Sequence, residues 1–138
     1  PLSKEYNLLR PSLIPSLLQI LSENQHNEYP QKIFEINTIV EKDDEKNSLA
    51  IAIYHEKANF TELKQILDAL FFSLKLEYQI NSEKSDTFIE GRCGKIIVNR
   101  KPIGIIGEIN PQVLVNMNLA NPASVLEIDL EFLCMSNN

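Results

Sequence analysis

The residue types that most often perform catalysis are few in this chain of 138 residues, and they are scattered along it. Its two histidines, His26 and His55, each stand alone among polar neighbours. No local grouping of serine, histidine and aspartate, or of cysteine and histidine, indicates a nucleophile with its base. Both histidines are therefore expected to be solvated side chains, and no catalytic residue is predicted.

Metal and phosphate sites are not indicated either. Cys93 and Cys134 are far apart and have no further thiol or histidine at metal-ligand spacing, which suits a reduced intracellular protein and disfavours zinc. The acidic residues at 41–45 offer oxygen ligands, yet they stand where a hairpin loop is needed, so a solvated turn is favoured. Gly104 and Gly107 lie within a strand pattern, where they allow close packing or a bulge instead of cradling a phosphate. No cofactor-binding or metal-binding residue is predicted.

The elements that would position any site follow from hydrophobic periodicity. Apolar residues at steps of three and four predict a helix over residues 13–25, which Ser12 would cap. A second helix is predicted over 60–75, where Asn59 and Glu62 form a variant of the capping box. The predicted strands cover residues 32–40, 49–54, 76–80, 93–98, 102–109 and 125–130, and a short helix covers 111–117.

The order of these elements predicts an α+β domain, with a mostly antiparallel sheet flanked by helices. Residues 41–48 are expected to form a turn or a long hairpin loop, and short connections between strands favour antiparallel pairing. The two amphipathic helices must bury their apolar stripes against the faces of the sheet. The domain is expected to span residues 1–133, with 134–138 as a C-terminal tail.

Composition and charge restrict the classes of function. Hydrophobic residues make up 43% and charged residues 23%, which fits one globular domain, and no apolar run approaches the roughly 20 residues of a membrane helix. Thirteen Lys and Arg against nineteen Asp and Glu give a net charge of -6, so the chain as a whole does not attract nucleic acid. The chain begins at Pro1 with no leader pattern, and it is expected to be a domain excised from a longer protein.

Six motifs, in order and in register, resemble the β chain of phenylalanyl-tRNA synthetase of the archaeal and eukaryotic type. They are PLS at residues 1–3, LRPSLIPSLL at 9–18, IFEI at 33–36, NFTELK at 59–64, GRC at 91–93 and GIIGEINPQVL at 104–114. The resemblance extends from Pro1 to about Leu133. Two departures are local turn variations: Asn110 stands where the family often has His before Pro, and Asn37 where Gly often follows Phe-Glu-Ile.

The resemblance implies a class II aminoacyl-tRNA synthetase-like core, homologous to the catalytic domain of the α chain but itself inactive. The complete enzyme would join phenylalanine to its tRNA using ATP and magnesium. It would be a cytoplasmic assembly of two α and two β chains, with the catalysis in α and the tRNA held by other parts of the assembly. No cofactor in this chain and no membrane partner are expected.

The charged residues of the chain also indicate that it is inactive. Class II sites hold ATP with two arginines, because guanidinium groups match phosphate oxygens and offset their charge. The resemblance places the first arginine near Glu35, on the hairpin over 33–54. An acid at this position would repel phosphate. The second arginine would follow the last strand, but no Lys or Arg occurs after Lys101. The chain is expected to end at that last strand, without the Gly-rich strand-to-helix element that would carry this arginine. Arg10 and Arg92 are interpreted as structural residues.

A structural role in pairing with the α chain is therefore the main hypothesis. In a class II fold the N-terminal helix region builds the subunit interface, so part of one apolar stripe, or a neighbouring apolar patch, is expected to remain exposed. The candidate interface residues are Leu13, Ile14, Leu17, Leu18 and Leu21. The alternatives are a stand-alone small-molecule-binding regulatory domain and an autonomous ligase.

Overall fold

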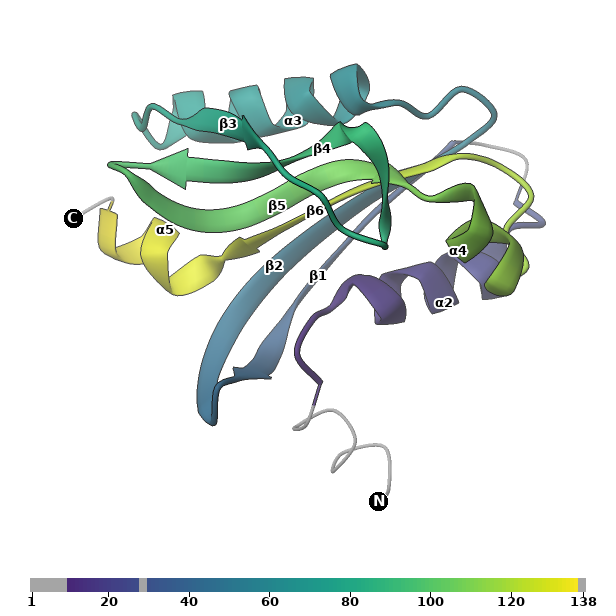
Figure 1. Ribbon diagram of the computed structural model, residues 1–138, viewed down its shortest axis with the longest axis horizontal. Helices are drawn as coiled ribbons and strands as arrows, with labels where there is room; N and C mark the ends of the chain where they lie inside the picture. The colour runs from purple at the N-terminus through teal and green to yellow at the C-terminus, as the bar shows by residue number, and fades with distance from the viewer. Residues whose placement is uncertain (1–9, 28–29, 137–138) are drawn as a thin grey trace.

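Six antiparallel strands form one sheet in the order β1-β2-β6-β5-β4-β3 (Figure 1). The computed structural model describes residues 10–27 and 30–136. The elements are α2 (Ile14–Asn24), β1 (Gln31–Glu41), β2 (Asp44–Tyr54), α3 (Phe60–Ser73), β3 (Gln79–Ser82), β4 (Phe88–Val98), β5 (Lys101–Ile109), α4 (Pro111–Asn116), β6 (Ala123–Asp129) and α5 (Leu130–Ser136). The expected antiparallel α+β architecture is confirmed.

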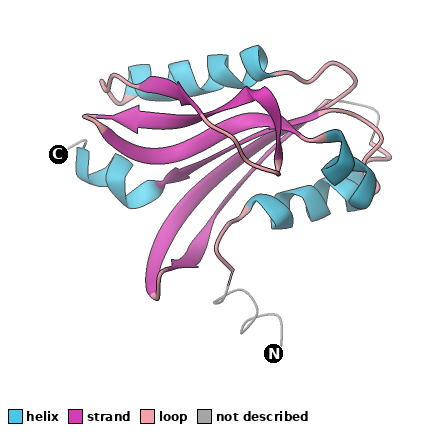
Figure 2. Cartoon of the chain, in the orientation of Figure 1, coloured by secondary structure: helices cyan, strands magenta, loops and turns pink. Residues whose placement is uncertain are grey.

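Helices cover both faces of the sheet, so the core has two halves (Figures 1 and 2). On one face, the buried side of α2 packs against small residues of β2, such as Ala50 and Ala52, with α4 beside it. On the other face, α3 and α5 pack through residues such as Leu67 and Leu133. We call these the α2 face and the α3 face. Burial of both apolar stripes is the main stabilising contribution.

The first hairpin is tighter than the sequence predicts. Strands β1 and β2 pair continuously from Gln31 opposite Tyr54 to Glu41 opposite Asp44. The turn contains only Lys42 and Asp43, whose φ angles of 51° and 68° are left-handed. This backbone matches a two-residue type I′ turn, whose twist suits the strands. Of the two alternatives expected over 41–48, the turn is found and the long loop is wrong, because cross-strand pairing continues through polar residues that no hydrophobic pattern marks.

Several other boundaries differ from expectation. Strand β4 begins at Phe88 rather than at 93, and β3 begins at Gln79 and reaches Ser82 rather than covering 76–80. Helix α5 was not predicted, although Leu133 within it is 5% exposed. A helix of this length carries too few apolar residues for its periodicity to stand out.

The capping predictions are half confirmed. The side chain of Asn59 accepts a hydrogen bond from the backbone N–H of Glu62 at 2.9 Å, as expected. Glu62 does not complete the capping box, because its carboxylate lies 2.6 Å from Nε2 of His55. At α2 the backbone N-cap is Leu13 rather than Ser12, although the Ser12 hydroxyl accepts from the N–H of Ile14 at 3.1 Å.

The two glycines of β5 are packing residues, as predicted. A Cβ at Gly107 would lie 2.6 Å from Cδ1 of Phe88, and a Cβ at Gly104 would clash with the carbonyl oxygen of Glu127. The strand can therefore approach β6 and β4 only without side chains at these positions.

Candidate functional site

A groove of about 350 Å³ opens on the α2 face, beside the N-terminal end of α2. Its walls come from the end of the β1–β2 hairpin, from β5 and β6, and from the chain at Pro11. Its charged lining residues are Glu41, Lys46, Lys95, Glu127 and Asp129. The groove is the place on this sheet where charged side chains from several strands meet, so it is the first candidate for chemistry.

Glu127 is the buried acid of this groove, and it is 9% exposed. Its carboxylate accepts hydrogen bonds from the Ser12 hydroxyl at 2.6 Å, from the Leu13 backbone N–H at 3.0 Å and from the Ser48 hydroxyl at 2.7 Å. These donors occupy both carboxylate oxygens. The acid therefore fixes the start of α2 to strands β2 and β6.

Arg10 and Glu35 form a second buried pair on the same face. Nη2 of Arg10 lies 3.2 Å from Oε2 of Glu35, and Nη1 donates to the Ser16 hydroxyl. Arg10 is 9% exposed, and its carbonyl oxygen accepts from the N–H of Val40 at 2.9 Å. The expected structural role of Arg10 fits this arrangement. Glu35, where the resemblance suggested a lost arginine, is held by this cation.

The lysines of the groove already have acidic partners. Nζ of Lys46 lies 3.6 Å from Glu41, and Nζ of Lys95 lies 3.1 Å from Glu83. The hydrogen bond from Lys95, and then that from the Lys84 backbone N–H, hold the pKa of Glu83 below its ordinary value. No cluster of three or more His, Cys, Asp or Glu side chains suited to a metal ion occurs among the described residues.

The sheet does continue into a helix after its last strand, which corrects one expectation. Strand β6 ends at Asp129 and α5 begins at Leu130. The Asp129 carboxylate accepts from the backbone N–H groups of Glu131 and Phe132, at 3.0 and 3.3 Å. The strand-to-helix element is therefore present, but an acid stands at its junction, and no glycine or arginine occurs in residues 123–136.

The remaining polar candidates join secondary-structure elements. His55 is not a freely solvated side chain, since it is only 21% exposed and pairs with Glu62, whereas His26 is exposed as expected. Arg92 pairs with Glu108 at 2.9 Å, as a structural residue would. Glu108 also accepts from the N–H of Phe60 at 2.8 Å, which ties the start of α3 to β5. Neither pair faces the groove described above.

The two departures from the family pattern have local roles. The side chain of Asn110 accepts from the backbone N–H of Gln112 at 2.8 Å and so caps α4. The side chain of Asn37 accepts from the N–H of Thr38 at 2.8 Å. Both therefore act on the backbone nearby, as expected for turn variations.

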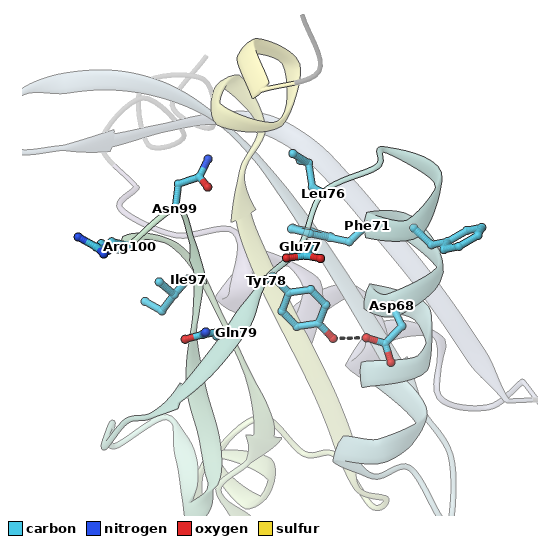
Figure 3. Close-up of a pocket in the computed structure, with 10 residues that line it drawn as sticks. Asp68, Phe71, Leu76, Glu77, Tyr78, Gln79, Ile97, Asn99 and Arg100 are labelled. Atoms are coloured by element: carbon cyan, nitrogen blue, oxygen red, sulfur yellow. Dashed lines mark hydrogen bonds between the residues drawn. The ribbon is translucent and has the colours of Figure 1, made fainter.

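A larger cavity of about 620 Å³ lies between α3 and the strands β3 and β4 (Figure 3). The Tyr78 phenol donates to the Asp68 carboxylate, and its ring meets that of Phe71 edge-on at 5.0 Å between centroids. Burial, and then the hydrogen bond and charge of Asp68, raise the pKa of Tyr78 well above its ordinary value. The Tyr78–Asp68 hydrogen bond lies at the α3 side of the cavity. These two polar groups already satisfy one another.

The candidate interface stripe is not exposed within the described chain. Every one of its members, Leu13, Ile14, Leu17, Leu18 and Leu21, is at most 6% exposed and packs in the α2 face of the core. The exposed large apolar side chains are Ile20, Phe34, Ile36, Phe72 and Val115. Phe34 and Ile36 lie on β1 on the face of the sheet opposite α2, so they form an exposed apolar patch that does not adjoin the α2 stripe.

The central residues of the groove were missed by sequence reasoning. The alternating pattern of this strand places Glu127 on the side opposite Leu126 and Ile128, which predicts a solvated position, so the pattern gave no signal of its burial. Its partners Ser12 and Ser48 lie 115 and 79 residues away in sequence, so nothing local indicates the contact.

Solved structures share this sheet and its helices. Pyrrolysyl-tRNA synthetase from Desulfitobacterium hafniense superposes with a TM-score of 0.77 at 20% sequence identity, covering 92% of this chain and 49% of that one. A second structure of that synthetase superposes with a TM-score of 0.76. The fold is therefore that of a class II aminoacyl-tRNA synthetase core.

Sequence comparison then identifies the family. Residues 1–130 match the model of the phenylalanyl-tRNA synthetase β chain CLM domain, and the chain belongs to this family. Phenylalanine–tRNA ligase β subunits of Thermococcus onnurineus and Archaeoglobus fulgidus are 44% and 39% identical, each over 94% of this chain. The chain spans only 24% of the length of either relative. The resemblance of the sequence motifs to this family is confirmed.

Proposed function

We propose that this chain is the non-catalytic class II-like core of a phenylalanine–tRNA ligase β subunit, with a structural role in pairing with the catalytic α chain. In the whole enzyme, phenylalanine is joined to tRNA with ATP and magnesium, and the chemistry takes place on α. The assembly contains two α and two β chains in the cytoplasm, and tRNA is bound by other parts of it. No helix among the described residues is long and apolar enough to cross a membrane.

One observation carries the non-catalytic part of the proposal. The buried acid of the groove, Glu127, accepts three hydrogen bonds from its own chain, and both groove lysines are paired with acids. A site for ATP needs cations directed at phosphate oxygens. The groove instead offers three acids, Glu41, Glu127 and Asp129. This lining supports a role in architecture, and nothing in the comparisons favours a regulatory domain.

The experiment is to co-express the full-length β protein with its α chain and to measure the mass of the product by light scattering. We expect a complex of two α and two β chains that forms phenylalanyl-tRNA, whereas β alone does not. Failure to form a complex with α would contradict the proposed pairing. Aminoacylation by the β protein alone would contradict the proposed inactivity.

A further inference from the structure

Two exposed apolar side chains stand next to each other on the first strand. Phe34 is 69% exposed and Ile36 is 53% exposed, and both lie on β1 at the edge of the sheet (Figure 1). Across the strand pair, Phe34 is opposite Ile51 and Ile36 is opposite Leu49. We call these four residues the β1 patch. Ile51 packs against the α3-face core, so the β1 patch continues that core to the rim of the sheet.

The backbone beside the patch has an open edge. The N–H of Val40 points away from β2, because it donates to the carbonyl of Arg10 at 2.9 Å. The backbone N–H and C=O groups of successive residues point to alternate sides of a strand, and the β1–β2 register is unbroken. The backbone groups of Lys32, Phe34 and Ile36 therefore also point away from β2. Among the described residues, no hydrogen bond reaches the outward backbone groups of these three residues.

The open segment has little of the usual protection of an edge strand, since Lys32 is the one charged residue among its three outward positions. Sheet edges are normally shortened, bulged, covered or charged. The opposite edge, β3, has only four residues, whereas β1 has eleven and no bulge. Toward the hairpin turn, the outward N–H of Val40 donates to the carbonyl of Arg10, and the outward N–H of Thr38 donates to the Asn37 side chain. Within the part of the chain that the structure describes, the segment 32–36 is left with open backbone groups and two exposed apolar side chains.

We propose that the α chain adds an extended segment to the outer edge of β1 at residues 32–36, with apolar side chains covering Phe34 and Ile36. This inference rests on the proposed function and assigns a surface to the pairing. Strand addition satisfies the outward N–H and C=O groups while pockets between alternate side chains give specificity. Lys32 has no ion pair among the described residues, so the segment carries a carboxylate beside it.

A second copy of this chain fits the edge less well than a different chain does. Antiparallel self-pairing centred on Phe34 would place Lys32 of one copy against Ile36 of the other, without a countercharge. Each copy also carries a net charge of -6, so the two would repel. The relatives are named β subunits, a name that assigns those proteins to an assembly with a different kind of chain.

The test places a photo-crosslinking amino acid at position 34 of the full-length β protein, co-expressed with α, and identifies the crosslinked chain by mass spectrometry. The matched control has the same probe at position 72, because Phe72 is 86% exposed on α3 and far along the sheet from β1. We expect an α–β crosslink from position 34 and none from position 72. A crosslink to another β chain, a crosslink within the same β chain, or no crosslink would overturn the proposal.

Substitutions give a second readout, the dissociation constant of the α–β complex. Ile36→Pro removes one outward N–H, which an edge strand tolerates, and Phe34→Glu places a charge in the patch. Each is expected to weaken association about tenfold or more, whereas Phe72→Glu leaves it unchanged. Wild-type affinity in both β1 variants would overturn the proposal. Unfolding of either variant in the absence of α would show that β covers its own edge, which also overturns it.

Failure of α–β pairing and failure of the β1 assignment give different results. If wild-type β forms no complex with α, the proposed function and the edge proposal both fall. If the complex forms while position 34 yields no crosslink to α, pairing stands and only its assignment to β1 is wrong.

Discussion

At the scale of residues, side chains of catalytic type serve the fold here. Glu127, Arg10 and His55 each join elements that are distant in sequence. The roles that sequence could predict are the local ones, such as Asn59 capping α3 and Gly107 permitting close packing. The contacts of Glu127 could not be predicted, because they require the register between strands to be known first.

Glu127→Ala is expected to lower the free energy of unfolding by about 3 kcal/mol or more, because it leaves two hydroxyls and one backbone N–H without their acceptor. Glu127→Gln keeps an acceptor oxygen, so about 1 kcal/mol is expected to be lost. Urea denaturation followed by circular dichroism measures both. Glu56→Gln, at an exposed position, is the control and should stay within about 0.5 kcal/mol of wild type. Equal effects at positions 56 and 127 would contradict the stabilising role of Glu127.

At the scale of elements, periodicity located every described helix and strand except α5. The observed boundaries differ from the predicted ones at the polar ends of hairpins and at the short edge strand β3. Residues 41–48 show why: pairing continues across them to a turn at Lys42 and Asp43, and of these two only the aspartate favours the left-handed backbone found there. The stripe of α2 was correctly predicted as apolar. Its assignment to a partner was not supported, because periodicity shows that a helix buries one side but not which surface covers it.

Helix α2 offers a direct comparison between a core position and a surface position. Leu17 is fully buried and Ile20, one turn away, is 40% exposed. Leu17→Ala is expected to cost about 2–5 kcal/mol of unfolding free energy, since it leaves a cavity beneath the helix, and Ile20→Ala is expected to cost less than 1 kcal/mol. Thermal denaturation of the β protein without α measures both. A Leu17 variant as stable as wild type that still fails to bind α would restore the α2 stripe as the interface.

At the scale of the whole molecule, the two faces of the sheet present different surfaces. The α2 face is closed by its own helix and by the buried bonds of Glu127, which leaves a small acidic groove. The α3 face is closed by α3 and α5 over the central strands but is open at β1, where Phe34 and Ile36 are exposed. The sheet thus presents an acidic groove on one face and an apolar rim at one edge.

The absence of nucleotide binding by the isolated 138-residue chain is the prediction that tests this view of the molecule. Each hydrogen bond between charged groups contributes roughly 1.5–3 kcal/mol, so two missing arginines cost about 3–6 kcal/mol, on the order of a hundredfold to ten-thousandfold in affinity. Calorimetric titration with ATP, magnesium and phenylalanine should show no saturable heat, while the assembled enzyme serves as the positive control for pyrophosphate exchange. Exchange should stay at background even in Glu35→Arg, because the second cation remains absent: no Lys or Arg follows Lys101. Micromolar binding of ATP by the unmodified chain would mean that the groove lined by Glu41, Glu127 and Asp129 accepts phosphate after all, and that the chain is a nucleotide domain.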